Sequence, residues 1–513
     1  MKKFRILAMA FAAMAIVSCQ KDGAETPGNG EQLTGPTYAT FNFNIGTSTY
    51  ADADYNPDTN PGATADDAKD ATVGPIQLLI FNAASQALEH NSVVTKGQTS
   101  KTVLLTAGQK KIFFVANTEK LTTLTAAIEP AAFVVGTATL SDFYKLNFSA
   151  GTPQQIVTDK TTARTFSFKN LYEQSNATAG SLAGLPMSNT NGITYTLAAG
   201  VTEAQASAGT AIKDGVSPTN TFSVQLYYMV AKARLVLAAD ILNTTATTKP
   251  FISDVTYTIR NLARVTNYIQ NVPTANNPQS YYYNYDKTLQ TDFNADFDYA
   301  SALTVPVTTT AANYLYVPEN NHSSILRGQS SYFAIKAFFN PTIITAVAYD
   351  LTTKVSYTYT VPTTTARNYI YTTKEVQGIP AGTYFATVAL FQEAAWMMQN
   401  NAPFVEATHR EDAKKLVTDP TSTAPTVGGD YMSFTGCNSY YRLDLGVGTG
   451  ATTQYGVLRS NKYDATINKI TGPGVPSEQD LITDPEKPVS ARTYVSATII
   501  PAVWTPLTQS GDL

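Results

Sequence analysis

The sequence is poor in cysteine, histidine and charge, and each shortage excludes a class of protein. Its 513 residues include two cysteines, Cys19 and Cys437, which excludes a fold held by several disulfides. Charged residues make up 14% of the chain, against a usual level of about 25%, and the net charge is −4. No basic cluster follows the first five positions, so the positive stripe that nucleic-acid binding requires is missing.

The chain also lacks the residue patterns of familiar catalytic and metal sites. Its three histidines lie far apart, and no H-E-x-x-H, G-x-S-x-G or phosphate-binding glycine motif is present. Oxygen-bearing residues alternate in Asp52–Asp58, but Pro57 and Ala63 stand where a calcium loop needs glycine and glutamate. Tyr281–Tyr283 and Trp396 could stack on sugars, although such residues more often fill a sandwich core. We predict no catalytic, metal or cofactor site.

The first nineteen residues carry an export signal. Basic residues within the first five positions precede an apolar run from Ile6 to Val17, which is too short to span a bilayer. Small residues then lead into Cys19, the pattern of a lipoprotein signal peptide. We expect residues 1–18 to be removed and Cys19 to be acylated. Several acyl chains, at about 0.8 kcal/mol per buried CH₂, would hold the protein on a membrane.

A predicted strand and a long polar segment follow a short tether. Residues 19–36 are polar and rich in glycine and proline, as in a flexible linker. Residues 37–45 then alternate between apolar and polar, which predicts a strand with one buried face. The residues of that face are Ala39, Phe41, Phe43 and Ile45. Residues 46–73 contain almost no large apolar side chain, so they predict an exposed, cleavable leash between this strand and the rest of the fold.

The remaining sequence is typical of an all-β protein. Short apolar or alternating runs bounded by turn residues predict strands at 76–81, 111–116, 222–228, 255–259, 332–339, 355–361 and 463–467. Short helices are predicted at 140–145, 391–399 and 410–416. Many short strands in a chain of this length favour two tandem β-sandwich domains, which we place at 37–240 and 241–513.

Several short motifs give the chain a resemblance to a known family. They occur in the family's order at 108–117 (GQKKIFFVAN), 185–188 (LPMS), 230–233 (VAKA), 316–320 (YVPEN), 458–464 (LRSNKYD) and 470–474 (ITGPG). Residues 495–504 resemble the family's closing strand. On these motifs the chain resembles the fimbrillins, the shaft subunits of type V pili of Bacteroidales bacteria.

The resemblance implies a mechanism of assembly. Such subunits are two tandem transthyretin-like sandwiches that reach the cell outer membrane as lipoprotein precursors. A surface protease removes the first strand, and the vacated groove accepts a strand from the C-terminal segment of a neighbouring subunit. The expected partners are further copies of the chain, anchor and tip pilins, and the protease; the expected product is an extracellular fimbria that supports adhesion or biofilm formation.

The leash departs from the family pattern. No arginine occurs between Arg5 and Arg164, although the best-studied members carry an arginine in the leash for an arginine-specific protease. The expected cleavage region consists of Gly46, Thr47, Ser48, Thr49, Tyr50 and Ala51. This leaves the protease open. It also leaves open whether the subunit belongs to the shaft, the anchor or the tip.

The C-terminal segment is the expected donor, with two alternative boundaries. Residues 493–513 are apolar enough to serve, and the residues expected to fill a groove are Tyr494, Val495, Ile499, Ile500, Val503, Trp504 and Leu507. In the alternative, 494–500 completes the sheet of its own domain and the donor is 503–513. A different class of function also stays open: a monomeric surface lipoprotein that binds glycan or protein.

Overall fold

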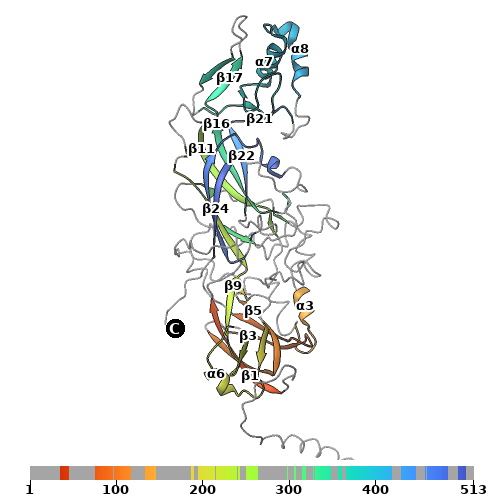
Figure 1. Cartoon of the computed structure of the whole chain (residues 1–513), viewed down its shortest axis with the longest axis vertical. Coiled ribbons are helices and arrows are strands. Elements are labelled where there is room, and N and C mark those ends of the chain that lie inside the picture. Colours follow the sequence, from red (N-terminus) through yellow and green to blue (C-terminus); the bar gives the residue numbers. More distant parts are fainter. Residues whose placement is uncertain are drawn as a thin grey trace, which may run out of the picture.

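The structure is a computed structural model and is mostly β (Figure 1). It describes residues 35–45, 75–95, 98–116, 133–145, 187–189, 194–213, 215–239, 241–242, 250–263, 297–298, 305–307, 315–318, 327–328, 330–347, 356–360, 365–418, 429–445, 457, 459–482 and 495–503. Three units follow one another along the long axis of these residues. The first strands lie at one end, a two-sheet sandwich lies in the middle, and a helix-bearing unit lies at the other end (Figure 1).

The first unit is one nine-stranded sheet with the path β3-β2-β5-β6-β9-β1-β4, and β7 and β8 extend it from β5. Its strands are β1 (Pro36–Ile45), β2 (Ile76–Asn82), β3 (Leu88–Val94), β4 (Ser100–Thr106), β5 (Gly108–Ala116), β6 (Met187–Ser188), β7 (Thr194–Leu197), β8 (Gly215–Ser217) and β9 (Thr221–Tyr228). The short helices α3 (Leu140–Lys145) and α6 (Glu203–Ala208) flank the sheet.

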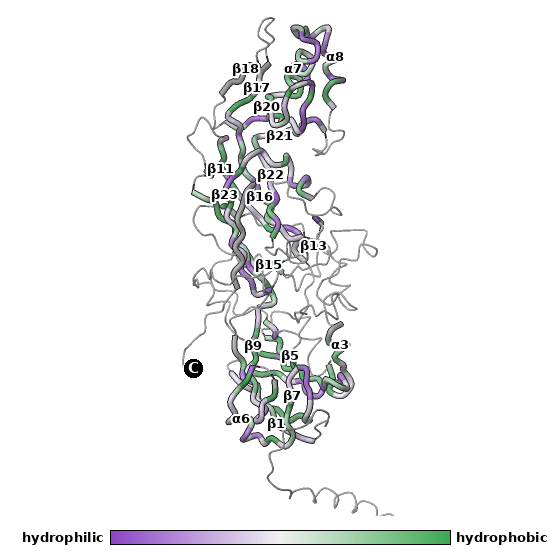
Figure 2. The backbone as a smooth tube through the Cα atoms, viewed as in Figure 1, coloured by the Kyte–Doolittle hydropathy of each residue, from purple (hydrophilic) through white to green (hydrophobic). Residues whose placement is uncertain are grey.

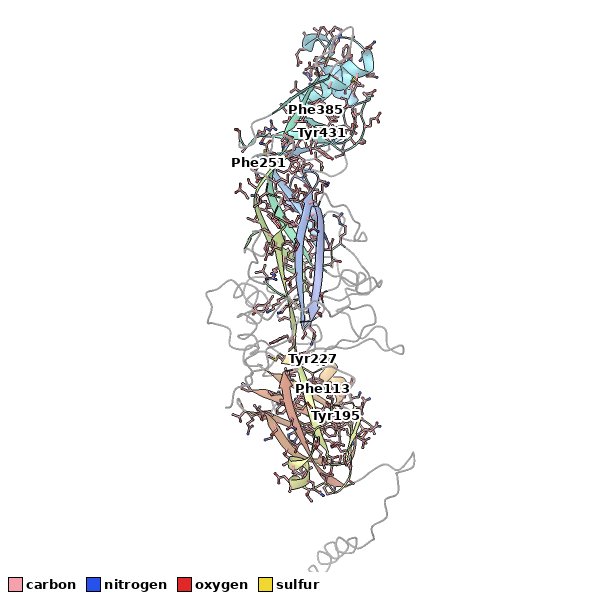
Figure 3. All side chains as sticks on the ribbon, turned by 60° about the vertical axis from the view of Figure 1, so that its left-hand side comes forward. Phe113, Tyr195, Tyr227, Phe251, Phe385 and Tyr431 are labelled. Carbon is pink, nitrogen blue, oxygen red and sulfur yellow. The ribbon has the colours of Figure 1, made fainter. Side chains whose placement is uncertain are left out.

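This sheet encloses a single apolar core. The two edge strands of the path come together where Thr106, at the end of β4, donates a hydrogen bond of 2.8 Å to Glu89 on β3. Hydrophobic residues gather on the strands of the unit, and Phe113 and Tyr195 belong to its core (Figures 2 and 3). Hydrogen bonding therefore joins the two layers expected of a sandwich into one continuous sheet.

The second unit is a sandwich of two four-stranded sheets. One sheet has the order β15-β10-β23-β24 and the other β14-β11-β16-β22. These strands are β10 (Val230–Leu237), β11 (Phe251–Arg260), β14 (Val305–Pro306), β15 (Leu315–Pro318), β16 (Tyr332–Asn340), β22 (Asn438–Asp444), β23 (Asn461–Ile470) and β24 (Val495–Val503). The core residues change from the first unit to the second between Val230 and Ala231, because β9 passes into β10 through one residue, Met229.

A small α/β unit at the far end was not anticipated from the sequence. Its sheet has the order β20-β19-β21, and the helices pack against it over a separate core (Figure 3). Its elements are β19 (Tyr369–Thr372), β20 (Tyr384–Phe385), α7 (Val388–Asn400), α8 (Glu406–Leu416) and β21 (Tyr431–Phe434). The ribbon β17 (Ile343–Val347) and β18 (Ser356–Thr360) lies beside it, and the pair β12 (Leu262–Ala263) and β13 (Phe297–Asp298) and the 3₁₀ helix η3 (Glu478–Ile482) complete the fold.

The predicted elements are confirmed, with longer bounds in several cases. The helix predicted at 140–145 is α3, and those predicted at 391–399 and 410–416 begin earlier, as α7 and α8. The all-β class is also confirmed. Helix α6 was missed, although Thr202 and Gln205 form a capping box that its sequence spacing could have revealed.

Candidate functional site

The first strand that the structure describes, β1, lies inside a sheet. On one side β1 pairs antiparallel with β4, where Thr40 lies opposite Thr102, and on the other it pairs parallel with β9, where Thr40 lies opposite Thr221. Because β4 reaches the rest of the sheet through β1, loss of β1 would leave a groove between β4 and β9 with unpaired backbone groups on both walls.

The alternation seen in the sequence places the apolar face of β1 in the core, as predicted. Ala39 and Phe41 have no exposed surface, and Phe43 is half-buried against the same core. The side chain of Ile45 lies outside the described residues. Thr40 on the opposite face is also buried, and its hydroxyl lies 2.8 Å from that of Thr102. The face of Ala39 and Phe41 is therefore covered by the core, and the opposite face is covered at Thr40.

Phe41 is the main apolar contact between β1 and the groove. Its ring stacks on Phe222 with centroids 5.8 Å apart, and it meets Phe114 at 5.7 Å and Tyr195 at 6.3 Å. Phe43 adds an edge contact with Phe114 at 5.0 Å. The rings around Phe41 come from β5, β7 and β9, which sequence analysis could not bring together.

Backbone and hydroxyl contacts hold the beginning of β1. The amide of Tyr38 donates to the carbonyl of Val201 at 2.9 Å, and the hydroxyl of Thr37 donates to the carbonyl of Ala198 at 2.7 Å. Asn220 contacts this part of the strand with both its backbone and its side chain. These loop residues were not singled out in the sequence; for Asn220, an asparagine directly before a strand was the available signal.

The last described strand of the chain is an edge strand. β24 pairs antiparallel with β23, with Ile500 opposite Asp464 and Val495 opposite Ile470, and no strand lies on its other side in the described sheet. Pro501 fits such a position, since an edge strand needs no donor on its open side. Among the expected donor residues, Val495, Ile499, Ile500 and Val503 lie in β24, and Tyr494, Trp504 and Leu507 lie outside the described residues. Residues 495–503 thus complete the sheet of their own unit here, as in the second boundary alternative.

Other expected sites fall outside the described residues. These are the acylation site Cys19 and the cleavage region Gly46–Ala51. Of the leash, the structure describes both flanks, where β1 ends at Ile45 and β2 begins at Ile76.

The sequence motifs meet at the junction between the first two units. Ser460 donates from its backbone to the carbonyl of Val230 at 2.9 Å and from its hydroxyl to the carbonyl of Tyr228 at 3.0 Å. Arg459 is fully buried and lies 3.3 Å from the hydroxyl of Ser188. Residues of the LPMS, VAKA and LRSNKYD motifs therefore join the units, and their role in this structure is architectural.

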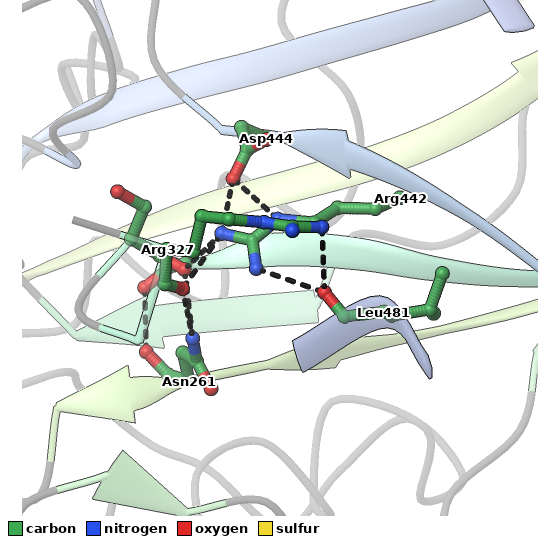
Figure 4. Close-up of polar contacts among 7 residues, drawn as sticks. Asn261, Arg327, Arg442, Asp444 and Leu481 are labelled. Carbon is green, nitrogen blue, oxygen red and sulfur yellow. Dashed lines mark hydrogen bonds and ion pairs between the residues drawn. The ribbon is translucent and has the colours of Figure 1, made fainter. Parts of the chain in front are cut away.

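A buried polar cluster anchors the segment that leads to the C-terminal strand (Figure 4). The guanidinium of Arg442 on β22 donates to Asp444 at 2.6 Å, to the carbonyl of Arg327 at 2.8 Å and to the carbonyl of Leu481 at 3.3 Å. It also lies 4.1 Å from the ring centroid of Tyr332. Because Leu481 belongs to η3, the connection between β23 and β24 is attached to the sandwich at this point.

One ionisable pair lies where the sheet of the first unit closes. Lys110 is fully buried, and its ammonium contacts Glu89 at 2.9 Å and Thr106 at 2.7 Å. Burial alone would raise the pKa of Glu89, but hydrogen bonds from Lys110, Asn82 and Thr106 outweigh it, and the pKa lies below its ordinary value. Glu89 is therefore favoured as the carboxylate.

Residues that could carry other chemistry have structural surroundings. Trp396 is 9% exposed and stacks on His409 with centroids 3.8 Å apart, and the ring of Phe404 lies 5.8 Å away in a T-shaped arrangement. The indole therefore has too little open surface to stack on a sugar. The ring of His90 contacts the hydroxyl of Ser92 at 2.8 Å, and burial lowers its pKa. In the described part of the chain, no three His, Cys, Asp or Glu side chains gather as a metal site would require. No described helix combines the length and apolar character needed to cross a membrane.

Among the comparisons with known proteins, the search of solved structures found similar chains. No protein-family profile matches the chain, and no curated protein matches it. The chain is similar to a presumed cell adhesion protein from Parabacteroides distasonis, with 13% identity, a TM-score of 0.41, and 93% of this chain and 99% of the other covered. It is also similar to a fimbrilin from Porphyromonas gingivalis, with 14% identity, a TM-score of 0.41 and the same coverage. The tip fimbrial protein Mfa3 of that species is similar at 11% identity and a TM-score of 0.34, over 92% of this chain and 100% of the other.

Proposed function

We propose that the chain is a structural subunit of a surface pilus of the fimbrillin type and that it polymerises by strand exchange. The observation that carries the proposal is the place of β1. The strand nearest the N-terminus lies inside a sheet, covers the core of the first unit and is joined to β2 by a polar segment without large apolar anchors. Cutting this segment would free one strand and leave the remaining chain intact.

The groove under β1 suits a replacement strand. Ladder hydrogen bonds to β4 and β9 do not depend on the side chains of the inserted strand, and the Phe41 position offers an aromatic cage for one large apolar side chain. Burial of such a side chain is worth roughly 1.5–3 kcal/mol. An extended apolar segment of a second copy could therefore replace β1.

The C-terminal segment is the proposed donor. Because β24 pairs with β23 along nine residues, the segment after Val503 can reach a second copy without loss of this pairing. A donor that also used residues 493–503 would have to leave the sheet first. Of the two alternatives, we favour the shorter donor, residues 503–513, as the segment that first binds a neighbouring subunit.

The same proposal includes the route to the surface. Acylation at Cys19 would tether the precursor to the outer membrane, and cleavage in the leash, in the region 46–51, would release it into a fimbria. Assembly would involve anchor and tip pilins and a surface protease that does not require arginine. Catalysis plays no part in this role. Adhesion would then be a property of the fibre.

A reversible lock on β1 tests the proposal. Thr40 and Thr102 lie directly opposite each other with hydroxyls 2.8 Å apart, so T40C/T102C should form a disulfide that ties β1 to β4. Burial raises the pKa of the Cys437 thiol, which makes it a poor competitor. After cleavage at a protease site inserted into 46–74, the oxidised variant should remain monomeric and the reduced variant should form fibres visible by electron microscopy.

The matched control is T345C/T358C, a second threonine pair directly opposite in the β17–β18 ribbon. Its disulfide leaves β1 free, so this variant should form fibres in both redox states. Fibres from oxidised T40C/T102C, in the same yield as from the control, would refute strand exchange at β1.

A further inference from the structure

Three loop residues contact the beginning of β1, and one of them, Asn220, makes several hydrogen bonds to it. Ala198 follows β7, Val201 precedes α6, and Asn220 precedes β9. Asn220 is fully buried and has a φ of 51°, in the left-handed region that few residue types adopt. A buried amide in this conformation suggests a role beyond that of a turn residue.

The side chain of Asn220 faces the backbone of β1. Its Nδ2 lies 2.9 Å from the hydroxyl of Thr37 and 3.0 Å from the carbonyl oxygen of Tyr38. The backbone carbonyl of Asn220 accepts a hydrogen bond from the amide of Thr40 at 2.9 Å. One residue thus satisfies a carbonyl, a hydroxyl and an amide at the beginning of the strand.

The amide is held in place by its own unit. The side-chain oxygen of Asn220 accepts a hydrogen bond from the amide of Ala198 at 2.8 Å, and its backbone amide donates to the carbonyl of Ser217 at 3.2 Å. Its Nδ2 also lies 2.9 Å from the carbonyl oxygen of Ala198, so the two hydrogens of this group are shared among that oxygen and the two acceptors on β1. The bonds to Ala198 and Ser217 do not involve β1. The donor that faces the strand therefore stays oriented when the strand leaves, which reduces the entropy cost of binding another.

We propose that Asn220 is a clasp that recognises the backbone of the strand in the β1 position, first β1 itself and then an extended segment of a second copy of this chain. The second step rests on the proposed function. A main-chain carbonyl is present in every extended segment, so the clasp accepts strands of different sequence, while the hydroxyl of Thr37 adds a contact specific to β1.

The test replaces Asn220 by glycine in the full chain. Glycine adopts the left-handed conformation without strain, so N220G removes the side-chain contacts of the clasp and keeps the turn and the backbone contact to Thr40. Hydrogen exchange of the amides in 37–43 is then followed by mass spectrometry, with the amides of β2 and β5 as an internal reference. Two side-chain hydrogen bonds to β1 are lost, each worth roughly a factor of two to twelve, so exchange in 37–43 should accelerate by roughly four- to 140-fold. The reference strands should keep their protection.

The control is N401G, which makes the same substitution at φ 51° in the cap of α7. It should leave exchange in 37–43 unchanged. A T37V variant removes the hydroxyl contact from the strand side, and its effect should be smaller in the N220G background, since both changes remove one shared bond. Unchanged exchange in N220G, or equal loss of protection in β1, β2 and β5, would overturn the clasp.

A second measurement separates the clasp from the proposed function. The chain is cut at a protease site inserted into 46–74, and release of the N-terminal fragment is followed with an excess of a synthetic peptide of residues 35–45. N220G should release the fragment faster than wild type and should bind the peptide with lower affinity. Both changes should match the factor by which hydrogen exchange in 37–43 accelerates. If the cut wild-type chain keeps its fragment and forms no fibres while N220G still loosens β1, strand exchange is refuted and the clasp on β1 stands.

Discussion

Removal of the Phe41 ring should be the most damaging single truncation in β1. The side chain has no exposed surface and contacts three aromatic rings, at centroid distances of 5.7, 5.8 and 6.3 Å. Truncation of a buried phenylalanine to alanine costs about 3–5 kcal/mol, from lost burial and from the cavity that remains. At about 1.4 kcal/mol per factor of ten, a loss of 4 kcal/mol would raise the opening of β1 by roughly a thousandfold.

The assay is urea unfolding of the full chain combined with hydrogen exchange of residues 37–43. F41A should lower the free energy of unfolding of the first unit by about 3–5 kcal/mol and remove most of the protection of β1. F43A should cost about 1.5–3 kcal/mol, since Phe43 is half-buried and has its described ring contact with Phe114 alone. L104A is the matched control, because Leu104 lies on the adjacent strand and is 55% exposed; its effect should stay within about 0.5 kcal/mol. A loss below about 1 kcal/mol in F41A would contradict the view that β1 is held by this aromatic cage.

The remaining predictions concern acid sensitivity, a glycine turn and the C-terminal segment. The pKa of Glu89 is lowered in the folded state, so its stabilising contribution is present above the ordinary pKa of 4.5 and is lost as pH falls through the folded value. We therefore expect E89Q to have a lower melting temperature than wild type at pH 7, and the difference to close toward pH 3. A melting-temperature gap that does not vary with pH would contradict this. G474A should destabilise the second unit by more than about 2 kcal/mol, because a Cβ at this φ of +62° would lie 2.3 Å from the carbonyl oxygen of Tyr440. The control G136A, at φ +83° with nothing within 4 Å, should cost about 1 kcal/mol. Equal losses of stability for the two variants in thermal unfolding would show that crowding at Gly474 is irrelevant. Deletion of residues 504–513 should leave a folded monomer that forms no fibres after cleavage of the leash; fibres in wild-type yield would exclude this segment as the donor.

Local patterns in the sequence determined the longest strands and three of the described helices. A period of two along residues 37–45 was sufficient to predict β1 and the burial of Ala39 and Phe41, because successive side chains of a strand point to opposite faces. Runs of apolar and aromatic residues likewise located β2, β5, β9, β11, β16 and β23. These signals depend on residues close together in the chain, so they could be read without the fold.

Only the tertiary structure decided what each element does. Nothing near residue 41 shows that its ring meets side chains from β5, β7 and β9, and nothing near Asn220 shows that it contacts β1, since these contacts join residues far apart in the sequence. The small α/β unit was missed for the same reason: its helices were predicted, but their common core with β19 to β21 exists only when the chain is folded. The apolar C-terminal pattern fitted both a donor and a resident strand, and pairing with β23 placed residues 495–503 in their own sheet, because a strand's pattern records that one face is buried and not which partner buries it.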